Sequence, residues 1–270
     1  MIEVWHNKSN QVTYFGENAL SENLKDISGK NILLICTPRS IQRNEIISSK
    51  ANLIQNNILF IDNSTLPNPS LANIQDIYEQ YKNKNVDLII AIGGGSVIDT
   101  AKVLSVAFQE YYPKIDELII NIKNIPYDKK TNLIAAPTTS GTGAEVTPFA
   151  TVWDYENSKK LSFAGDIIIP DIIILDPLYA KSVPHAIQLD CALDALSHSL
   201  ESLWNKNRNS MSTIFSIKAL GIMCKTLPLI IKNNTTKESI SQQMLASYYS
   251  GIAISETKTA IAHAISYPLT

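Results

Sequence analysis

Short apolar runs alternate with longer amphipathic stretches in the first part of the chain, and this alternation limits its fold more than any other feature. The apolar runs typical of buried strands are NILLIC (31–36), ILFID (58–62) and VDLIIAIG (86–93). Helical patterns follow them at about 40–55, from the predicted N-cap Ser70 through Tyr81, and at 96–108. Repeated strand–helix units predict a parallel sheet with helices on both sides.

The pattern changes in the middle of the chain. Three further strands are predicted at 133–137, 147–154 and 171–176, with a turn at NSKKL between the last two. From Pro184 onward the sequence is helical, with one amphipathic helix at 187–204 and two more after it. We therefore predict an α/β domain over residues 1–180 and an all-helical domain over residues 181–270.

Composition excludes several classes of function. The chain has 270 residues and a net charge of −2, so it lacks the basic surface of a nucleic-acid-binding or anionic-membrane-binding protein. No apolar run is expected to reach the length of a membrane span, and the N-terminus lacks the features of a secretory signal. Cys36, Cys191 and Cys224 have no CxxC or metal-like spacing, which indicates reduced thiols and predicts a cytoplasmic protein.

A glycine-rich turn, Gly93-Gly94-Gly95-Ser96, joins the strand at 86–93 to the helix at 96–108. Glycines let backbone N–H groups approach a pyrophosphate, and the helix N-terminus adds partial positive charge. Ser96 can donate to a phosphate, and Asp99 and Lys102 can be tied into the same site. A plain strand-to-helix turn is the alternative, but one glycine would suffice for it. The turn favours phosphate binding, although it is not the GxGxxG fingerprint.

A second loop of small residues, PTTSGTGAE (137–145), also follows a predicted strand. Its hydroxyl groups and glycines can bind ribose or phosphate. Loops rich in Ser, Thr and Gly are usually only connections, so this loop alone is a weak signal. Together with the triple-glycine turn, it indicates one elongated ligand that contacts both segments.

Asp194 and His198 lie four residues apart in a strongly helical segment, which places both side chains on one face. A carboxylate and an imidazole there can ligate a divalent metal, although an Asp–His hydrogen bond or a surface pair is the commoner reason for such spacing. His263 lies in the apolar stretch AIAHAISY, where a buried imidazole needs a partner. Three ligands leave one position of a tetrahedral site, either for water or substrate oxygen or for a missing protein ligand.

The motifs GGGSVIDTAK, PTTSGTGAEVT, DPLYAKSVP, DALSHSLES and AIAHAISYPLT stand in the order found in the iron-containing (group III) alcohol dehydrogenases. The chain resembles this family over essentially its whole length. The resemblance implies a Rossmann-like dinucleotide-binding domain followed by an all-helical domain, the dehydroquinate synthase-like architecture. It also implies hydride transfer between NAD(P)H and a small aldehyde or alcohol, with iron(II), or zinc in some relatives, polarising the substrate carbonyl.

The resemblance assigns roles residue by residue. The implied cofactor-binding residues are Asn68, Gly94, Gly95, Ser96, Asp99, Thr138, Thr139 and Lys160. The implied metal ligands are Asp194, His198 and His263, three of the four that the family uses. Tyr267 stands where many members carry a histidine near the substrate, and its phenol can donate a hydrogen bond there, which makes it the candidate catalytic residue.

Two departures from the family pattern lead to further expectations. The chain ends at Thr270, before the Pro-His-Gly motif that supplies the fourth ligand, so we expect a C-terminally truncated form. Its helical domain should leave apolar faces uncovered, which predicts poor solubility or burial in a homo-oligomer. The segment 36–40 carries no carboxylate for a ribose 2′-hydroxyl, and Arg39 can meet a 2′-phosphate, which favours NADPH.

Within the family, TPFATVWDYEN and HAISYPLT look most like the phosphonoacetaldehyde reductases, which implies reduction of phosphonoacetaldehyde to 2-hydroxyethylphosphonate in phosphonate biosynthesis. Two alternatives remain open. One is a broad dehydrogenase for short alcohols or diols, such as lactaldehyde or 1,3-propanediol. The other is a non-catalytic, cofactor-binding remnant.

Overall fold

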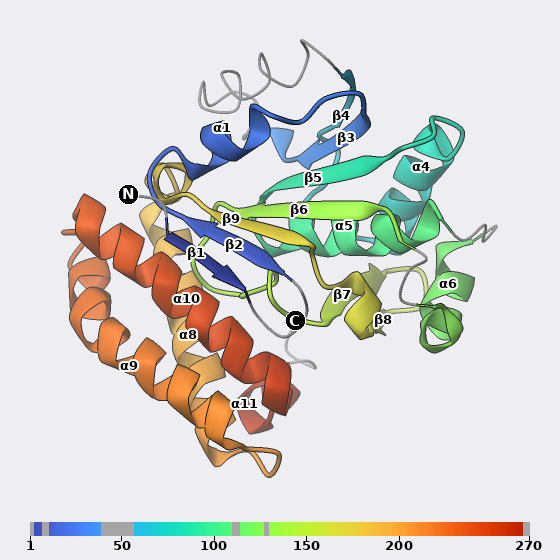
Figure 1. Cartoon of the computed structure of the whole chain (residues 1–270). Helices are drawn as coiled ribbons and strands as arrows, with labels where there is room; N and C mark the ends of the chain where they lie inside the picture. The colour runs from blue at the N-terminus through green and yellow to red at the C-terminus, as the bar shows by residue number, and fades with distance from the viewer. Residues whose placement is uncertain (1–2, 7–10, 39–56, 110–113, 127–129, 267–270) are drawn as a thin grey trace. The chain divides into compact units, whose positions relative to one another are not determined.

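The computed structural model describes residues 3–6, 11–38, 57–109, 114–126 and 130–266. The chain divides into two compact units (Figure 1). Unit 1 comprises Met1–Pro137 and Pro148–Asp176, and unit 2 comprises Thr138–Thr147 and Pro177–Thr270.

Unit 1 is built on a seven-stranded sheet. Its strands lie in the order β1 (Glu3–His6), β2 (Val12–Phe15), β9 (Ile172–Leu175), β6 (Asn132–Pro137), β5 (Leu88–Gly93), β3 (Asn31–Cys36) and β4 (Ile58–Asp62). Among the described strands of this sheet, β1 runs antiparallel to β2, and the six strands from β2 to β4 in this order are parallel to one another. All six residues of β5 are buried, as its continuous apolar sequence predicts. The predicted parallel sheet is confirmed.

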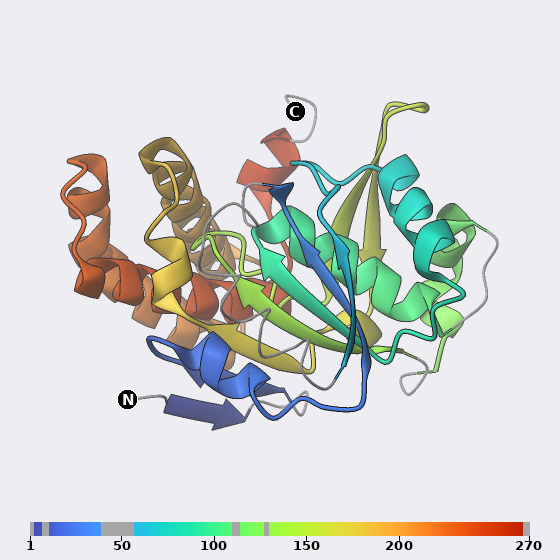
Figure 2. The same cartoon turned by 90° about the horizontal axis from the view of Figure 1, so that it is seen from above.

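Helices cover both faces of this sheet, as Figure 2 shows for unit 1. They are α1 (Ala19–Leu24), α4 (Leu71–Tyr81), α5 (Gly95–Ala107) and α6 (Ile115–Asn121). The predicted N-cap of α4 is confirmed, because the Ser70 hydroxyl accepts a hydrogen bond from the Asn73 amide at 3.0 Å. The helix predicted at 40–55 lies entirely outside the described residues.

A two-stranded hairpin extends unit 1. It pairs β7 (Phe149–Asp154) with β8 (Lys159–Ala164) in antiparallel register, from Phe149 opposite Ala164 to Asp154 opposite Lys159. The turn predicted at NSKKL is shorter than expected, since its two lysines already belong to β8. Val152 and Phe163 are buried in the hairpin, while Lys159 and Lys160 lie beside the turn that closes it.

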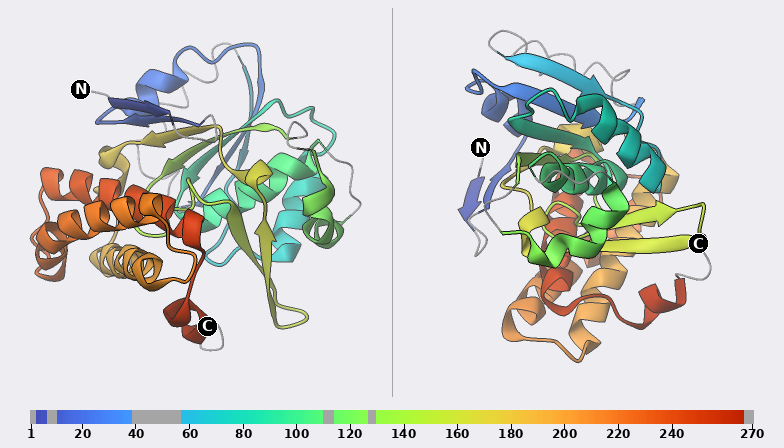
Figure 3. Two further views of the ribbon diagram at one scale, coloured as in Figure 1. Left: turned by 60° about the horizontal axis from the view of Figure 1, so that its bottom comes forward. Right: turned by 90° about the vertical axis from the view of Figure 1, so that its right-hand side faces the viewer.

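Unit 2 consists of three long helices and two short ones, α7 (Pro177–Ala180), α8 (His185–Trp204), α9 (Ser210–Ile231), α10 (Lys237–Thr257) and α11 (Ile261–Ser266). Figure 3 shows α8, α9 and α10 side by side. Small residues let these helices approach one another, and Ala195, Ala219 and Ala246 are fully buried around Met223. Asn209 and Thr236 begin α9 and α10 with reciprocal capping hydrogen bonds, which fixes where each helix starts.

Helix α9 departs from the expectation that no segment reaches the length of a membrane span. Among the described residues it alone is long and apolar enough, with a mean hydropathy of 1.8. Length and composition do not separate a membrane span from a core helix, and α9 packs along α8 and α10 through Ser212, Ser216 and Ala219. Its outer side exposes Ile214 and Ile217, which fits the expected uncovered apolar face, while the homo-oligomer stays a prediction.

Candidate metal and cofactor sites

Helix α8 presents a polar face inside an otherwise apolar bundle. Asp194, His198 and Glu201 follow one another at intervals of four and three residues, so they line one side of the helix. His198 is 7% exposed and Glu201 is fully buried. Buried groups of this kind need charged or hydrogen-bonding partners, and α11 supplies one in His263.

The structure brings Asp194, His198 and His263 together. Oδ1 of Asp194 lies 3.7 Å from Nε2 of His198 and 3.6 Å from Nε2 of His263. The two imidazole rings stack with their centroids 4.8 Å apart and their planes inclined by 11°. Side chains from two helices, separated by more than sixty residues of sequence, therefore converge on one point.

These separations decide between a hydrogen-bonded pair and a metal site. Ordinary N–H···O bonds measure about 2.7–3.2 Å, so both carboxylate–imidazole distances are too long for direct hydrogen bonds. Two donors that each lie about 2.1 Å from a tetrahedral metal stand roughly 3.4 Å apart, which is close to the observed 3.6 and 3.7 Å. The spacing therefore fits ligands that share one ion.

The chemistry of the three donors fits a divalent metal as well. One carboxylate oxygen and two imidazole nitrogens, all within 4.8 Å of one another, form a donor set that suits iron(II) or zinc. Nε2 of each imidazole faces the Asp194 carboxylate, so these two nitrogens are the candidate ligand atoms.

The protonation states of Asp194 and His198 suit the binding of a cation. Burial disfavours ionisation of Asp194, but the two imidazoles outweigh burial and hold the pKa of the carboxyl below its ordinary value. Burial lowers the pKa of His198, against the attraction of Asp194. At neutral pH the carboxylate is thus ionised and His198 is neutral, which are the protonation states that metal binding requires. The Asp194 carboxylate, followed by Glu201, raises the pKa of His263.

Glu201 is the site residue that the sequence interpretation missed. Its carboxylate lies 2.9 Å from Nδ1 of His263, on the opposite side of that ring from Asp194. A signal was present in the sequence, because residues 194, 198 and 201 share one helical face. The interpretation stopped at the DxxxH pair and so left out the next acidic residue on that face.

In unit 1, the glycine-rich turn leads directly from β5 into α5. Gly94 is the N-cap and Gly95 the first helical residue, so the free amides of the first turn surround these glycines. The Ser96 hydroxyl accepts a hydrogen bond from the Asn68 amide at 3.2 Å, and Asn68 adopts a left-handed conformation with φ of 60°. Four predicted cofactor residues, Asn68, Gly94, Gly95 and Ser96, therefore lie together at the N-terminus of α5.

Asp99 and Lys102 stabilise the next turn of α5. Asp99 accepts a hydrogen bond from the Thr151 amide at 2.9 Å, and the fully buried Lys102 donates to the Phe149 carbonyl at 2.9 Å. The two side chains lie 4.0 Å apart. Burial raises the pKa of Asp99 to about 6, although Lys102 and the Thr151 amide both oppose the shift. These contacts attach the β7–β8 hairpin to α5.

This pKa predicts how stability responds to pH. Between the ordinary carboxyl value of 3.8 and about 6, Asp99 is protonated in the folded chain and ionised in the unfolded chain. Protonation of Asp99 therefore stabilises the folded chain fully below pH 3.8, and this stabilisation is lost as the pH rises from 3.8 through about 6. We expect wild type to lose as much as about 3 kcal/mol of unfolding free energy relative to Asp99→Asn across the window, measured by urea unfolding. Parallel pH profiles for the two proteins would contradict this.

Lys160, another predicted cofactor residue, stands on β8 directly opposite Trp153 of β7. Its Nζ lies 5.0 Å from the centroid of the indole ring, which is a cation–π contact. Partial burial lowers the pKa of Lys160. The Trp153 amide donates to the Pro69 carbonyl at 2.9 Å, so the hairpin that carries Lys160 is attached beside the Asn68 turn.

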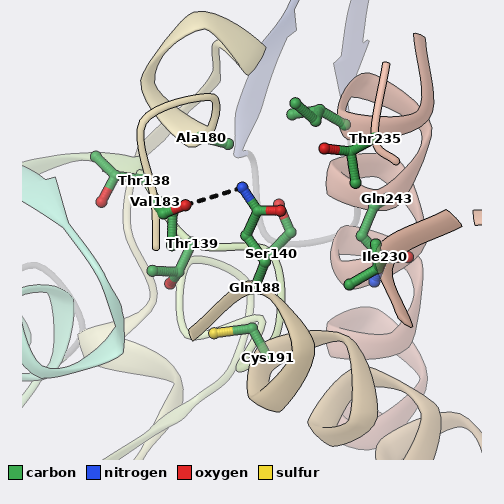
Figure 4. Close-up of a pocket in the computed structure, with 11 residues that line it drawn as sticks. Thr138, Thr139, Ser140, Ala180, Val183, Gln188, Cys191, Ile230, Thr235 and Gln243 are labelled. Atoms are coloured by element: carbon green, nitrogen blue, oxygen red, sulfur yellow. Dashed lines mark hydrogen bonds between the residues drawn. The ribbon is translucent and has the colours of Figure 1, made fainter. Parts of the chain in front are cut away.

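Thr138 and Thr139 belong to unit 2, where they line a pocket with residues of α7, α8, α9 and α10 (Figure 4). The Gln188 amide donates to the Val183 carbonyl across this pocket at 2.9 Å. Cys191 lies at the same pocket, one turn before Asp194. Burial and then the charge of Asp194 raise the pKa of its thiol to about 11, so it stays protonated and is a poor nucleophile.

Two predicted positions lie outside the described residues. Tyr267, the candidate catalytic residue, follows the end of α11, and Arg39, the candidate for a 2′-phosphate, follows β3. Their roles therefore stay predictions, and the same holds for the contribution of Thr138 and Thr139 to a cofactor site.

Comparison with known proteins places these features in a family. The sequence model of "Iron-containing alcohol dehydrogenase" matches residues 10–177, and that of "Fe-containing alcohol dehydrogenase family, C-terminal" matches residues 188–270. The 4-hydroxybutyrate dehydrogenase of Clostridium kluyveri is 32% identical over 213 residues, which is 78% of this chain and 56% of the relative. The 1-propanol dehydrogenase of Citrobacter freundii is 27% identical, over 95% of this chain and 65% of the relative.

A solved structure agrees with this assignment. The iron-containing alcohol dehydrogenase of Thermotoga maritima is 29% identical and superimposes with a TM-score of 0.87, over 100% of this chain and 73% of that protein. It has the same architecture, which confirms the predicted combination of a Rossmann-like part and a helical part. The chain spans about 56–65% of the length of the two curated relatives named above.

Proposed function

Because this chain belongs to the iron-containing alcohol dehydrogenase family, we propose that it is an oxidoreductase that uses NAD(P)H and a divalent metal to reduce a small aldehyde in the cytoplasm. One observation carries the proposal within the structure. A carboxylate and two imidazoles converge at 3.6 and 3.7 Å, too far apart for hydrogen bonds and well spaced for ligands of one ion.

Asp194, His198 and His263 would hold iron(II), or zinc, and the bound ion would supply Lewis-acid polarisation of the substrate carbonyl. The chain's own residues supply the rest. Asp194 brings negative charge that offsets the cation, and His198 enters as a neutral donor because its pKa is lowered. With three protein donors, the arrangement leaves room for a substrate oxygen or a further ligand.

In unit 1, the amides at the N-terminus of α5 would bind the cofactor pyrophosphate, since Gly94 and Gly95 leave them free of side-chain cover. Asn68 and Ser96 would line the same site, with Asp99 holding the hairpin against α5. Lys160 would contribute positive charge toward the dinucleotide. The cofactor supplies the hydride, and we retain NADPH as the preferred form because of Arg39 in the sequence.

Among aldehydes, we propose phosphonoacetaldehyde as the substrate, on the strength of the sequence resemblance at 147–157 and 263–270. The relative named for 4-hydroxybutyrate supports an anionic substrate, because that compound also carries a negative charge at the end away from its hydroxyl. The relative named for 1-propanol favours the second candidate, a dehydrogenase of broad specificity for short alcohols or diols.

A turnover assay with iron- or zinc-loaded protein distinguishes these candidates. We expect kcat/KM for phosphonoacetaldehyde to exceed that for propanal and lactaldehyde by at least about tenfold, equivalent to about 1.4 kcal/mol of transition-state binding. NADPH should be used in preference to NADH, and a chelator should stop turnover. Equal rates with all three aldehydes would support the broad enzyme instead. Cofactor binding without turnover of any aldehyde would support the non-catalytic reading.

A further inference from the structure

Glu201 is a fully buried carboxylate whose two oxygens receive three hydrogen bonds from a single short segment. Oε2 accepts from the Ala260 amide at 2.6 Å and contacts Nδ1 of His263 at 2.9 Å. Oε1 accepts from the His263 amide at 3.1 Å. All three contacts reach from α8 to the start of α11, so one side chain holds both the backbone and the ring of His263.

The contact to the backbone explains where α11 begins. Ala260 precedes the first helical residue and His263 lies in the first turn, so their amides are among those that a helix leaves without intrahelical partners. A carboxylate at this end also interacts favourably with the helix dipole. Because α11 has only six residues, the hydrogen bonds of Glu201 attach a large part of this short helix to α8.

The contact to the ring determines which nitrogen of His263 faces Asp194. An ionised carboxylate only accepts hydrogen bonds, and both oxygens of Glu201 already receive backbone amides. The ring must then donate from Nδ1, so in the neutral ring the lone pair of Nε2 is directed toward Asp194.

We propose that Glu201 is the positioning residue of this site, which fixes the orientation and the Nδ1–H tautomer of His263 before a metal binds. The inference rests on the proposed metal site and adds to it a residue outside the ligand set. A carboxylate that orients a ligating imidazole raises its basicity and removes the free-energy cost of turning the ring.

The test compares Glu201→Gln with Glu256→Gln, a matched change at an exposed residue of α10 that also accepts a side-chain hydrogen bond. Metal affinity is measured by competition with a chelator, for zinc and for iron(II). We expect Glu201→Gln to weaken binding by about 10- to 100-fold. Glu256→Gln should stay within about twofold of wild type, as expected for an exposed position. Equal affinities for the two variants would overturn the proposal.

A double-mutant cycle separates positioning from general structural damage. In the background of His263→Ala, the further change Glu201→Gln should cost less than about twofold in metal affinity, because the ring on which Glu201 acts is gone. A full 10- to 100-fold loss in that background would show that Glu201 acts through the fold and not through His263.

The second readout is the tautomer of the neutral ring in metal-free protein, observed by nitrogen-15 NMR of the imidazoles at a pH alkaline enough to deprotonate His263, whose pKa is raised, with His263→Ala to identify the signal. Wild type should carry the proton on Nδ1, and Glu201→Gln should shift it toward Nε2. If Glu201→Gln fails to fold, the tautomer of His263 in wild type is still a test, because a proton on Nε2 and none on Nδ1 would overturn the proposal. Neither readout uses turnover. A protein that binds metal tightly through Glu201 but reduces no aldehyde would therefore contradict only the proposed function.

Discussion

His198→Ala is expected to lower metal-dependent turnover by about a thousandfold or more, because Lewis-acid polarisation of a carbonyl is worth several kcal/mol of transition-state stabilisation. Metal affinity should fall by at least about 100-fold, since one of the three donors that the described residues bring together is lost. Both quantities are measured with iron- and zinc-loaded protein. Binding of NADPH, followed by its fluorescence, should remain within about threefold of wild type, because the glycine-rich turn belongs to unit 1.

His185→Ala is the matched control, since His185 is the first residue of the same helix. Its Nε2 contacts the Ile230 carbonyl at 2.7 Å, and it takes no part in the Asp194 cluster. We expect this variant to keep metal affinity and turnover, with a small loss of stability for the hydrogen bond. If His198→Ala weakened metal and cofactor binding equally, His198 would be a structural residue and the metal site would be wrong.

The strands and helices of unit 1 were predictable where sequence pattern and burial agree. β3 and β5 are continuous apolar runs because they lie inside the sheet, and the described structure places them where the runs occur. β1 lies at the edge of the sheet and β2 next to it, and both were missed because short strands with half-exposed residues, such as VTYF of β2, give a weak signal. β8 was missed for the same reason, since its exposed lysines resemble a turn.

The candidate metal cluster was predictable in part, because Asp194 and His198 share a helical face whatever the rest of the fold does. His263 reaches them only through a tertiary arrangement. α10 ends at Thr257, Lys258 has a positive φ of 65°, and the chain turns back so that α11 meets α8. No local sequence pattern predicts that α11 packs against α8. The structure explains this packing by the hydrogen bonds that the buried Glu201 accepts from the Ala260 and His263 amides.

A pair of glycines fixes the loop Thr138–Thr147 against α10. Gly143 has φ of +60° and its backbone touches that of Gly251, so close that a Cβ on either glycine would meet the Cα of the other at under 3 Å. A Cβ on Gly251 would also lie 2.6 Å from Cγ2 of Val146. The loop carries Thr138 and Thr139 and lies against Cys191 through Gly141, so this contact positions several residues of unit 2.

Gly251→Ala should therefore destabilise unit 2, although alanine is the better helix former. A Cβ that overpacks against backbone atoms costs about 1–3 kcal/mol of unfolding free energy or more, because the backbone of Gly143 cannot rotate away as a side chain can. This cost is larger than the gain in helix propensity on replacing glycine by alanine, which is at most about 1 kcal/mol. The matched control is Gly221→Ala on α9, where a Cβ meets nothing within 4 Å and only the propensity gain remains. Thermal unfolding followed by circular dichroism should show a lower Tm for Gly251→Ala, by about 2–8 °C, and an unchanged or higher Tm for Gly221→Ala. Shifts of the same sign in both variants would mean that the close contact between Gly143 and Gly251 does not govern how this loop packs.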